Sequence, residues 1–491
     1  MNLFKKAAAV AMSALVVVAS IPITGANAAA QKITQYDLTK NNAAINGDGV
    51  YRLIGSRNSA SVTIESDTTA TVTLANLTAA TITLGSNANV TFLLSGTSKL
   101  DGIYEPESSH ITISSAAGDG STDGSLTCSG GIGGKPGTYG MSDDGQSEGY
   151  YSVVWGDTVY ATGSHTPATS GGKGLDAYSD GMNCGEITIS GGTITSHIGG
   201  GNGGSGGSAN GGKGFKYDSK GSYSSLPTGN GGAGGTGGKG SNGGNSGLIT
   251  VTGGKIRGSV GGGAGGNGGT ANGGDGATMD GRRGGTGGAG GTSGAGGNGG
   301  NCTEIDVTGG EIDGSVGGGA GGLSGSATGG MGGGDESASG GTTGAGGTSG
   351  AGGTGGKSDE IEISGGTISG SVGGGNGGST GDASGGCADT LYTSDGTRRY
   401  TGYSTPSNPG TSGLAGNGAE ASSITITGGS VTGHVGGGFG GSSGDTNQGS
   451  VLLWDFSNFH LSSKPTKQGK CGNSGNGAVC DSVFISGGKV I

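Results

Sequence analysis

Aromatic and hydrophobic residues are scarce in this chain of 491 residues: aromatic residues make up 4% of it and hydrophobic residues 29%. A globular enzyme of this length needs a large apolar core, and this composition cannot supply one. The 8 prolines are too few for a collagen-like Gly-X-Y register. Beyond the N-terminus no run is apolar enough to cross a bilayer, so we expect no membrane insertion.

Glycine, by contrast, is abundant: the chain has 131 glycines, whereas an average protein has about 7%. A chain with so much glycine and so little core material is either a repetitive solenoid or a low-complexity disordered segment. Acidic residues also outnumber basic ones, 35 to 24. This negative balance argues against nucleic acid and against anionic membranes as partners.

The N-terminus has the pattern of a bacterial export signal. Lys5 precedes an apolar run over residues 7–18, and Ala28 ends a small-residue cleavage motif. Basic, apolar and small-residue regions in this order are typical of a signal peptide, which we place at residues 1–28. The sequence therefore predicts a bacterial protein that is secreted, extracellular or at the cell surface.

One phrase recurs through most of the chain. It reads ITISGGTI at residues 187–194, and a degenerate copy precedes it at residues 126–131. Successive copies are about sixty residues apart, and a fixed period of this kind indicates a repeat architecture. The Gly-Gly pairs of the later copies begin at Gly253, Gly309, Gly365, Gly428 and Gly487.

Each copy alternates apolar and polar residues on both sides of its Gly-Gly pair, as in Ile249 and Val251 before it and Ile256 and Val260 after it. Alternation predicts strands with one buried face, and the glycines permit a corner between them. One copy cannot bury its own apolar face, but copies stacked at about 4.8 Å bury a continuous column of Ile and Val. We therefore predict an all-β fold, a parallel β-solenoid (β-helix) with repeats of about sixty residues.

Charged residues at equivalent positions support this stacking. Lys255 and Arg257 stand where the next copy has Glu311 and Asp313, so the predicted register creates two opposite-charge pairs. Each exposed pair adds little stability. The pairs serve here as evidence for the alignment of the copies.

The six cysteines show no Cys-x-x-Cys or Cys/His spacing that would predict zinc. Cys184, Cys302 and Cys480 occupy one column of the repeat, in copies that are not adjacent, so we expect packed thiols there. Cys471 and Cys480 are close in sequence and, in an exported protein, are candidates for a disulfide.

Three regions follow from these patterns. After the signal peptide, residues 29–125 contain less glycine and shorter apolar alternations, which predict tight β-helix rungs that cap the N-terminal end. Residues 126–491 form the glycine-rich solenoid repeats with aromatic-tipped arms. The sequence stops at Ile491, just after the seventh Gly-Gly pair, and an open solenoid edge favours end-to-end self-association.

Between the strand pairs lie glycine-rich excursions with a period of three, such as the outgoing limb 261–276 and the returning limb 284–300. A three-residue period is typical of a polyproline-II-type helix, so we predict polyglycine-II-like arms that run out and back. The alternative is a set of flexible Gly/Ser linkers. The out-and-back symmetry of the two limbs favours ordered arms.

The segments at which the arms turn around are rich in aromatic residues. Variable aromatic loops on a rigid scaffold are typical of recognition surfaces, although aromatics can also pack into small local cores. The candidate binding residues are Tyr150, Tyr151, Trp155, Tyr217, Tyr392, Tyr400, Tyr403, Trp454 and Phe456.

The run from Val72 through Leu100 to the CSGGIGG phrase at residues 128–134, together with the ITISGGTI phrases, resembles glycine-rich, adhesin-like β-strand-repeat proteins exported by Gram-positive gut bacteria. That resemblance implies a surface or adhesin-like protein, in some cases one that binds carbohydrate. The arms also look like the polyglycine-II bundles of phage tail-fibre adhesins and of a springtail antifreeze protein. In the phage adhesins, loops at the bundle tips bind the receptor.

No constellation of side chains predicts catalysis. The five histidines show neither triad nor metal spacing, and we expect them to be exposed on strands. One outward strand face of adjacent copies carries four carboxylates, which form a weak candidate site for Ca²⁺, with a solvated acidic face as the alternative. These carboxylates are Glu304, Asp306, Glu360 and Glu362. We expect no other cofactor and no enzyme activity.

Two hypotheses for function follow. The first is a non-catalytic, secreted or cell-surface adhesin-like protein whose tip loops contact a glycan or a surface receptor. The alternative is a self-assembling structural fibre or extracellular matrix protein that stacks through its open solenoid ends. Binding of ice or of a crystal surface by a flat Gly/Thr/Asn face is a third interpretation.

Overall fold

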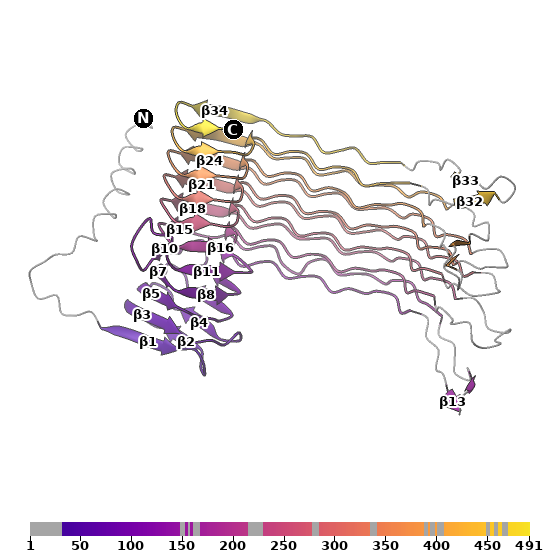
Figure 1. Cartoon of the computed structure of the whole chain (residues 1–491), viewed down its shortest axis with the longest axis horizontal. Helices are drawn as coiled ribbons and strands as arrows, with labels where there is room; N and C mark the ends of the chain where they lie inside the picture. The colour runs from indigo at the N-terminus through magenta and orange to yellow at the C-terminus, as the bar shows by residue number, and fades with distance from the viewer. Residues whose placement is uncertain are drawn as a thin grey trace, which may run out of the picture.

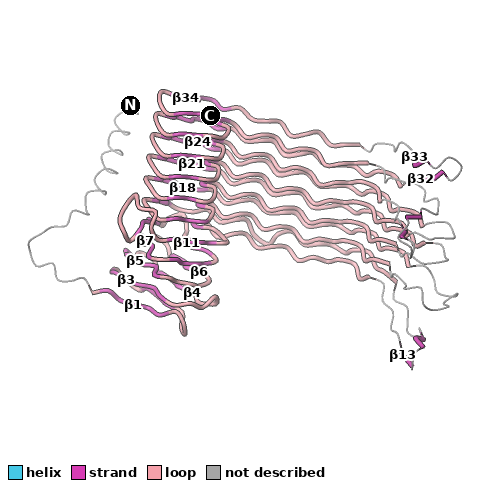
Figure 2. Tube along the Cα trace, in the orientation of Figure 1, coloured by secondary structure: helices cyan, strands magenta, loops and turns pink. Residues whose placement is uncertain are grey.

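A computed structural model of the chain describes an all-β molecule with two parts, a spine of stacked strands and a layer of long arms that leave one side of it (Figures 1 and 2). Its described residues are 32–147, 167–214, 229–276, 284–333, 341–386, 407–447 and 470–491, with the backbone of six further short strands. The predicted signal peptide therefore lies outside the described residues. In the described part of the chain there is no helix, and hence none that could cross a bilayer.

The spine consists of three long, entirely parallel sheets, which confirms the predicted parallel β-solenoid. In chain order, the 11-stranded sheet contains β1 (Ile33–Asp37), β3 (Gly49–Ile54), β5 (Thr69–Ala75), β7 (Asn89–Ser95), β10 (His110–Ser115), β15 (Glu186–Ile189), β18 (Ser246–Val251), β21 (Cys302–Val307), β24 (Ser358–Ile363), β29 (Ala421–Ile426) and β34 (Cys480–Ile485). The 10-stranded sheet contains β2 (Ala43–Ile45), β4 (Ser61–Ile64), β6 (Thr81–Leu84), β9 (Gly102–Tyr104), β12 (Ile132–Gly133), β17 (Ile198–Gly199), β20 (Val260–Gly261), β23 (Val316–Gly317), β26 (Val372–Gly373) and β31 (Val435–Gly436). The 8-stranded sheet contains β8 (Thr97–Leu100), β11 (Ser125–Cys128), β16 (Thr193–Thr195), β19 (Lys255–Ile256), β22 (Glu311–Ile312), β25 (Thr367–Ile368), β30 (Ser430–Val431) and β35 (Lys489–Val490).

The core of the spine is a set of apolar columns, one residue from each rung. Ile249 pairs with Ile187 of the rung before it and with Ile305 of the rung after it, in the predicted register. Within one rung, Ile249, Val251 and Ile256 are fully buried. Burial of one such side chain contributes about 1.5–3 kcal/mol, and stacking repeats that contribution along the whole spine.

The Gly-Gly pair forms the corner between the first two strands of a rung. Its second glycine is in the left-handed region in every repeat, for example with φ of 81° at Gly254 and 82° at Gly310. An L-residue rarely adopts this conformation, so glycine is required there. Just after this corner, Lys255 Nζ lies 2.6 Å from Glu311 Oε1, which confirms the predicted alignment of the copies. Lys255 Nζ also lies 3.7 Å from Asp313 Oδ2, so one lysine is the ionic partner of both carboxylates.

The glycine arms are ordered, because their backbones hydrogen-bond to one another. The Gly265 amide donates to Ala320 O, on the outgoing limb of the next arm, at 2.8 Å. The Gly266 amide donates to Ser241 O, on the returning limb of the arm before, also at 2.8 Å. Outgoing limbs thus form one layer and returning limbs a second, joined by main-chain bonds. The flexible-linker alternative does not describe these limbs.

Every third residue of a limb faces outward, and many of these positions hold asparagine. The Asn202 side-chain oxygen accepts the Ala264 amide of the next arm at 2.9 Å, and Asn242 accepts the Asn298 amide at 2.9 Å. Asparagine therefore pairs backbone donors at the outward positions, where no main-chain acceptor faces them. The recurring Gly-Gly-Asn triplet is explained by these ladders.

We expect the bundle to reject a side chain at an inward glycine. A Cβ at Gly266 would collide with the carbonyl of Gly204 in the neighbouring limb, so Gly266→Ala forces the limbs apart. Overpacking of this kind costs about 1–3 kcal/mol. The thermal midpoint of Gly266→Ala should fall by several degrees, whereas Ala351→Ser, at an exposed outward position, should match the parent. Equal midpoints for both variants would contradict a close-packed bundle.

Candidate functional site

Three arms end in short antiparallel hairpins at the far end from the spine, where β13, β32 and β33 are labelled in Figure 1. Trp155, Tyr392 and Trp454 lie in their strands, of which the structure describes only the backbone, and Trp454 stands opposite Leu461. The other candidate binding residues, Tyr150, Tyr151, Tyr217, Tyr400, Tyr403 and Phe456, lie outside the described residues. The hairpins are β13 (Val153–Trp155) with β14 (Thr158–Tyr160), β27 (Leu391–Tyr392) with β28 (Arg398–Arg399), and β32 (Leu452–Asp455) with β33 (His460–Ser463).

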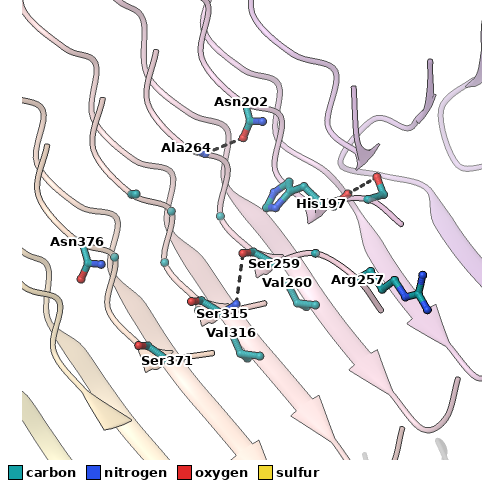
Figure 3. A pocket seen from close by; sticks show the side chains of 18 of the residues that line it. His197, Asn202, Arg257, Ser259, Val260, Ala264, Ser315, Val316, Ser371 and Asn376 are labelled. Carbon is teal, nitrogen blue, oxygen red and sulfur yellow. Dashed lines mark hydrogen bonds between the residues drawn. The ribbon is translucent and has the colours of Figure 1, made fainter. Parts of the chain in front are cut away.

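A groove of about 610 Å³, which the sequence patterns did not predict, lies along the spine where the outgoing limbs begin (Figure 3). One side is a row of serines from successive rungs, Ser259, Ser315 and Ser371, each just before a strand of the 10-stranded sheet. The opposite side is formed by the first outward residues of the limbs. In successive arms these residues are Asn202, Ala264, Ala320 and Asn376.

Histidines occupy the serine position in the rungs on either side of this row. His197 lines the groove, and its Nε2 is 3.0 Å from Gly200 O. His434 makes the same contact with Gly437 O at 3.1 Å, and its ring centroid is 4.7 Å from that of Phe439. The expectation of exposed histidines holds for His434 but is wrong for His110 and His197, which are half-buried. The side chains of His165 and His460 lie outside the described residues. Burial lowers the pKa of His197, so the ring is neutral at neutral pH.

The four carboxylates of the calcium hypothesis are neighbours across β21 and β24. Glu304 pairs with Glu360 and Asp306 with Glu362 in the sheet register. Burial, together with the charges of Glu304, Glu362 and Glu360, raises the pKa of Asp306 to about 6. Among the described residues, however, no group of His, Cys, Asp and Glu side chains is arranged to hold a metal ion. The geometry adds no support for calcium, which stays an untested prediction.

A second column of the spine holds small polar residues in place of Ile and Val. Ser246 pairs with Cys302, and Cys302 with Ser358, all within 2% of complete burial. Burial raises the pKa of the Cys302 thiol to about 12, so the thiol stays protonated and unreactive. Cys184 lies one rung before Ser246, and its thiol is also buried and free. These thiols are packed and unbonded, as predicted from their spacing.

The predicted Cys471–Cys480 disulfide is not formed, because both cysteines are free. Cys471 lies on the last returning limb, where its sulfur is 3.0 Å from Thr446 Oγ1, and Cys480 begins β34. Nine residues in a limb that rises about 3.1 Å per residue span about 28 Å. A disulfide allows at most about 7 Å between its two Cα atoms. Closeness in sequence is therefore misleading in an extended limb.

Glu105 is a buried carboxyl that the sequence patterns did not indicate. It follows β9, at the level of the spine just before the first arm, and is 2% exposed. Neither of its oxygens has a hydrogen-bond partner within the described part of the chain. Burial first, and the charge of Glu186 second, raise the pKa of Glu105 to about 9, against a smaller opposing effect of the Gly185 amide. The side chain is therefore protonated at neutral pH.

No protein-family model matches the chain, and no curated protein matches it either. Among solved structures it is similar to the nine-helix polyproline-II bundle of a springtail antifreeze protein from Granisotoma rainieri, with 24% identity and a TM-score of 0.10. The match covers 42% of this chain and 92% of that protein. A superposition this weak says nothing about function.

The buried Glu105 should make stability fall with rising pH. The unfolded chain releases this proton near its ordinary pKa of about 4.5, whereas the folded chain holds it up to about 9. The contribution of this group is thus full below about pH 4.5 and is lost as pH rises toward 9, by about 1.4 kcal/mol per unit. Glu105→Gln should remove this slope in urea midpoints measured between pH 5 and pH 8. Glu107→Gln, at an exposed neighbour, should keep it, and an unchanged slope in Glu105→Gln would refute the assignment.

Proposed function

We propose that this chain is a secreted or cell-surface, adhesin-like binding protein without catalytic activity, whose arm tips contact a glycan or a surface receptor. The observation that carries the proposal is the placement of the aromatic-bearing hairpins at one end of an ordered bundle, far from the spine (Figure 1). A binding surface carried by an ordered support costs less entropy on binding, because the support itself needs no ordering.

The described limbs of neighbouring arms also lie side by side along their length. Successive limbs are joined by main-chain bonds, such as those from the Gly206 amide to Asn267 O and from the Gly268 amide to Leu323 O. A row of tips can engage a repetitive surface at several points, which raises avidity without any stronger single contact. This geometry suits an envelope or a polysaccharide layer better than a single soluble ligand.

The sequence adds two supports that concern location and chemistry. The predicted signal peptide at residues 1–28 favours export, and the excess of acidic residues disfavours nucleic acid as a partner. The His197 and His434 rings bind the backbone carbonyls of Gly200 and Gly437. The His110 ring lies on the outer face of β10, with Nδ1 3.2 Å from Glu186 Oε2 and Nε2 3.2 Å from Thr112 Oγ1. The resemblance to adhesin-like repeat proteins points the same way.

Removing tip aromatics should abolish surface binding and leave the fold intact. The variant Trp155→Ala/Tyr392→Ala/Trp454→Ala removes one aromatic from each hairpin. Its binding to intact bacterial and epithelial cells, measured by flow cytometry with labelled protein, should weaken at least about tenfold, or 1.4 kcal/mol. The matched control is Tyr139→Ala/Tyr178→Ala, which removes exposed aromatics from the limbs instead. Parental binding by the tip variant, with an unchanged thermal midpoint, would contradict the proposal.

The alternative, a self-assembling fibre, is favoured by the apolar surface of the last rung. Val483 and Ile485 of β34 are 44% and 50% exposed, whereas the residues they pair with, Ile424 and Ile426, are fully buried. A further rung, from a second copy or from more of the same chain, would cover them. If copies stack there, the apparent molar mass from light scattering should rise with protein concentration, and Ile485→Glu should abolish the rise. An apparent molar mass that stays at the monomer value at all concentrations in the parent would remove the fibre hypothesis.

A further inference from the structure

The groove at the base of the outgoing limbs has a lining that neither the fold nor the tips account for. Ser259 and Ser315 are exposed although they lie beside the buried Val260 and Val316. Figure 3 shows the serines in a row along the spine and the Asn202 and Asn376 side chains on the limb side. The groove is separated from the tips by the length of the arms, so a ligand bound here is distinct from one at the tips (Figure 1).

The backbone of the groove cannot accept another strand. The Val260 amide donates to Ser315 O at 2.8 Å, and the Val316 amide donates to Ser371 O at 2.8 Å. On the limb side, the Gly262 amide donates to Gly317 O at 3.0 Å. An extended peptide that binds by strand addition needs unpaired amides and carbonyls, which these rungs do not present. The chemistry available to a ligand comes from side chains.

The side chains of the groove carry almost no charge. Arg257 is the one permanently charged residue among those that line it, and the His197 ring is neutral because burial lowers its pKa. Phosphate-bearing ligands and nucleic acids are held by several cationic groups, so they fit this lining poorly. An uncharged ligand with many hydrogen-bonding groups fits it well.

Hydroxyl and amide groups repeat along the groove. The Ser259 hydroxyl accepts the Ser315 amide at 3.3 Å, whereas within the described residues no hydrogen bond involves the Ser315 and Ser371 hydroxyls. Asn202 and Asn376 use their side-chain oxygens to accept the Ala264 and Phe439 amides, which leaves their NH₂ groups as donors. We propose that the groove binds a linear, uncharged oligosaccharide that lies along the spine axis.

The small residues in the middle of the groove give the ligand room. Ala264 and Ala320 stand at the centre of the limb side, between Asn202 and Asn376. From Asn202 to Asn376 there are three inter-rung steps of about 4.8 Å, or about 14 Å in all. The serine row stops at His434, whose ring packs against the exposed Phe439. The groove thus takes a short stretch of an extended glycan, with donors concentrated near its two ends.

The test uses the full chain and a set of linear hexasaccharides, namely cellohexaose, xylohexaose, maltohexaose and hexa-N-acetylchitohexaose, with hexagalacturonate as the charged comparison. Isothermal titration calorimetry should detect at least one neutral hexasaccharide with a Kd below about 1 mM and weaker binding of hexagalacturonate. Ala320→Trp, which fills the centre of the groove, should weaken binding at least about tenfold. Ala351→Trp is the matched control, because Ala351 is an equally outward alanine on the returning limb of the same arm.

The outcomes decide the proposal. No neutral hexasaccharide bound below about 1 mM, or equal binding by the two tryptophan variants, overturns it. If Ala320→Trp lowers the thermal midpoint, the double variant Ser315→Ala/Ser371→Ala is used as the groove variant instead. An affinity of that double variant equal to the parent's overturns the proposal. The triple hairpin variant should keep hexasaccharide binding, so failure of the tip hypothesis and failure of the groove are told apart.

Discussion

The repeat distance between parallel strands, about 4.8 Å, is the constraint on which the rest of the molecule depends. The spine sets this distance through columns such as Ile187, Ile249 and Ile305. Both limbs of every arm join the spine, so neighbouring limbs start at the same spacing. Backbones held this close leave no room for a Cβ at inward positions, as the contact between Gly266 and Gly204 shows. The glycine content therefore follows from geometry, and the outward third position is where sequence can vary.

The spine was predictable from the sequence because its signals are periodic. Alternating Ile and Val around each Gly-Gly pair defined strands, faces and register, and the charges at Lys255 and Glu311 confirmed which residues stack. The order of the arms was also foreseeable from their three-residue period. The Asn202 and Asn242 ladders were readable in the Gly-Gly-Asn triplets, but their meaning depends on knowing which limb lies next to which.

Other features could not be read from local patterns. The predicted Cys471–Cys480 disulfide was wrong because, in an extended limb, residues that are near in sequence lie far apart in space. The groove depends on Ser259, His197 and Asn202 meeting at a corner between spine and limb, a junction that no single repeat reveals. Glu105 was overlooked because the residues beside it, Gly185 and Glu186, are distant in the sequence. Six of the nine tip aromatics lie outside the described residues, so their prediction still rests on composition.

The stacking order has a consequence for how the chain reaches its structure. The N-terminal rungs, from β1 to β10, are short and carry the larger core residues, including Phe92, Leu74 and Leu94. Closing a short loop costs less entropy than closing one that carries a whole arm, so these rungs are the natural nucleus. Each later rung then forms on a finished template, with its limbs laid against those already in place. Growth from one end would suit the export proposed above, because each segment that leaves a channel N-terminus first would find its neighbouring rung already formed.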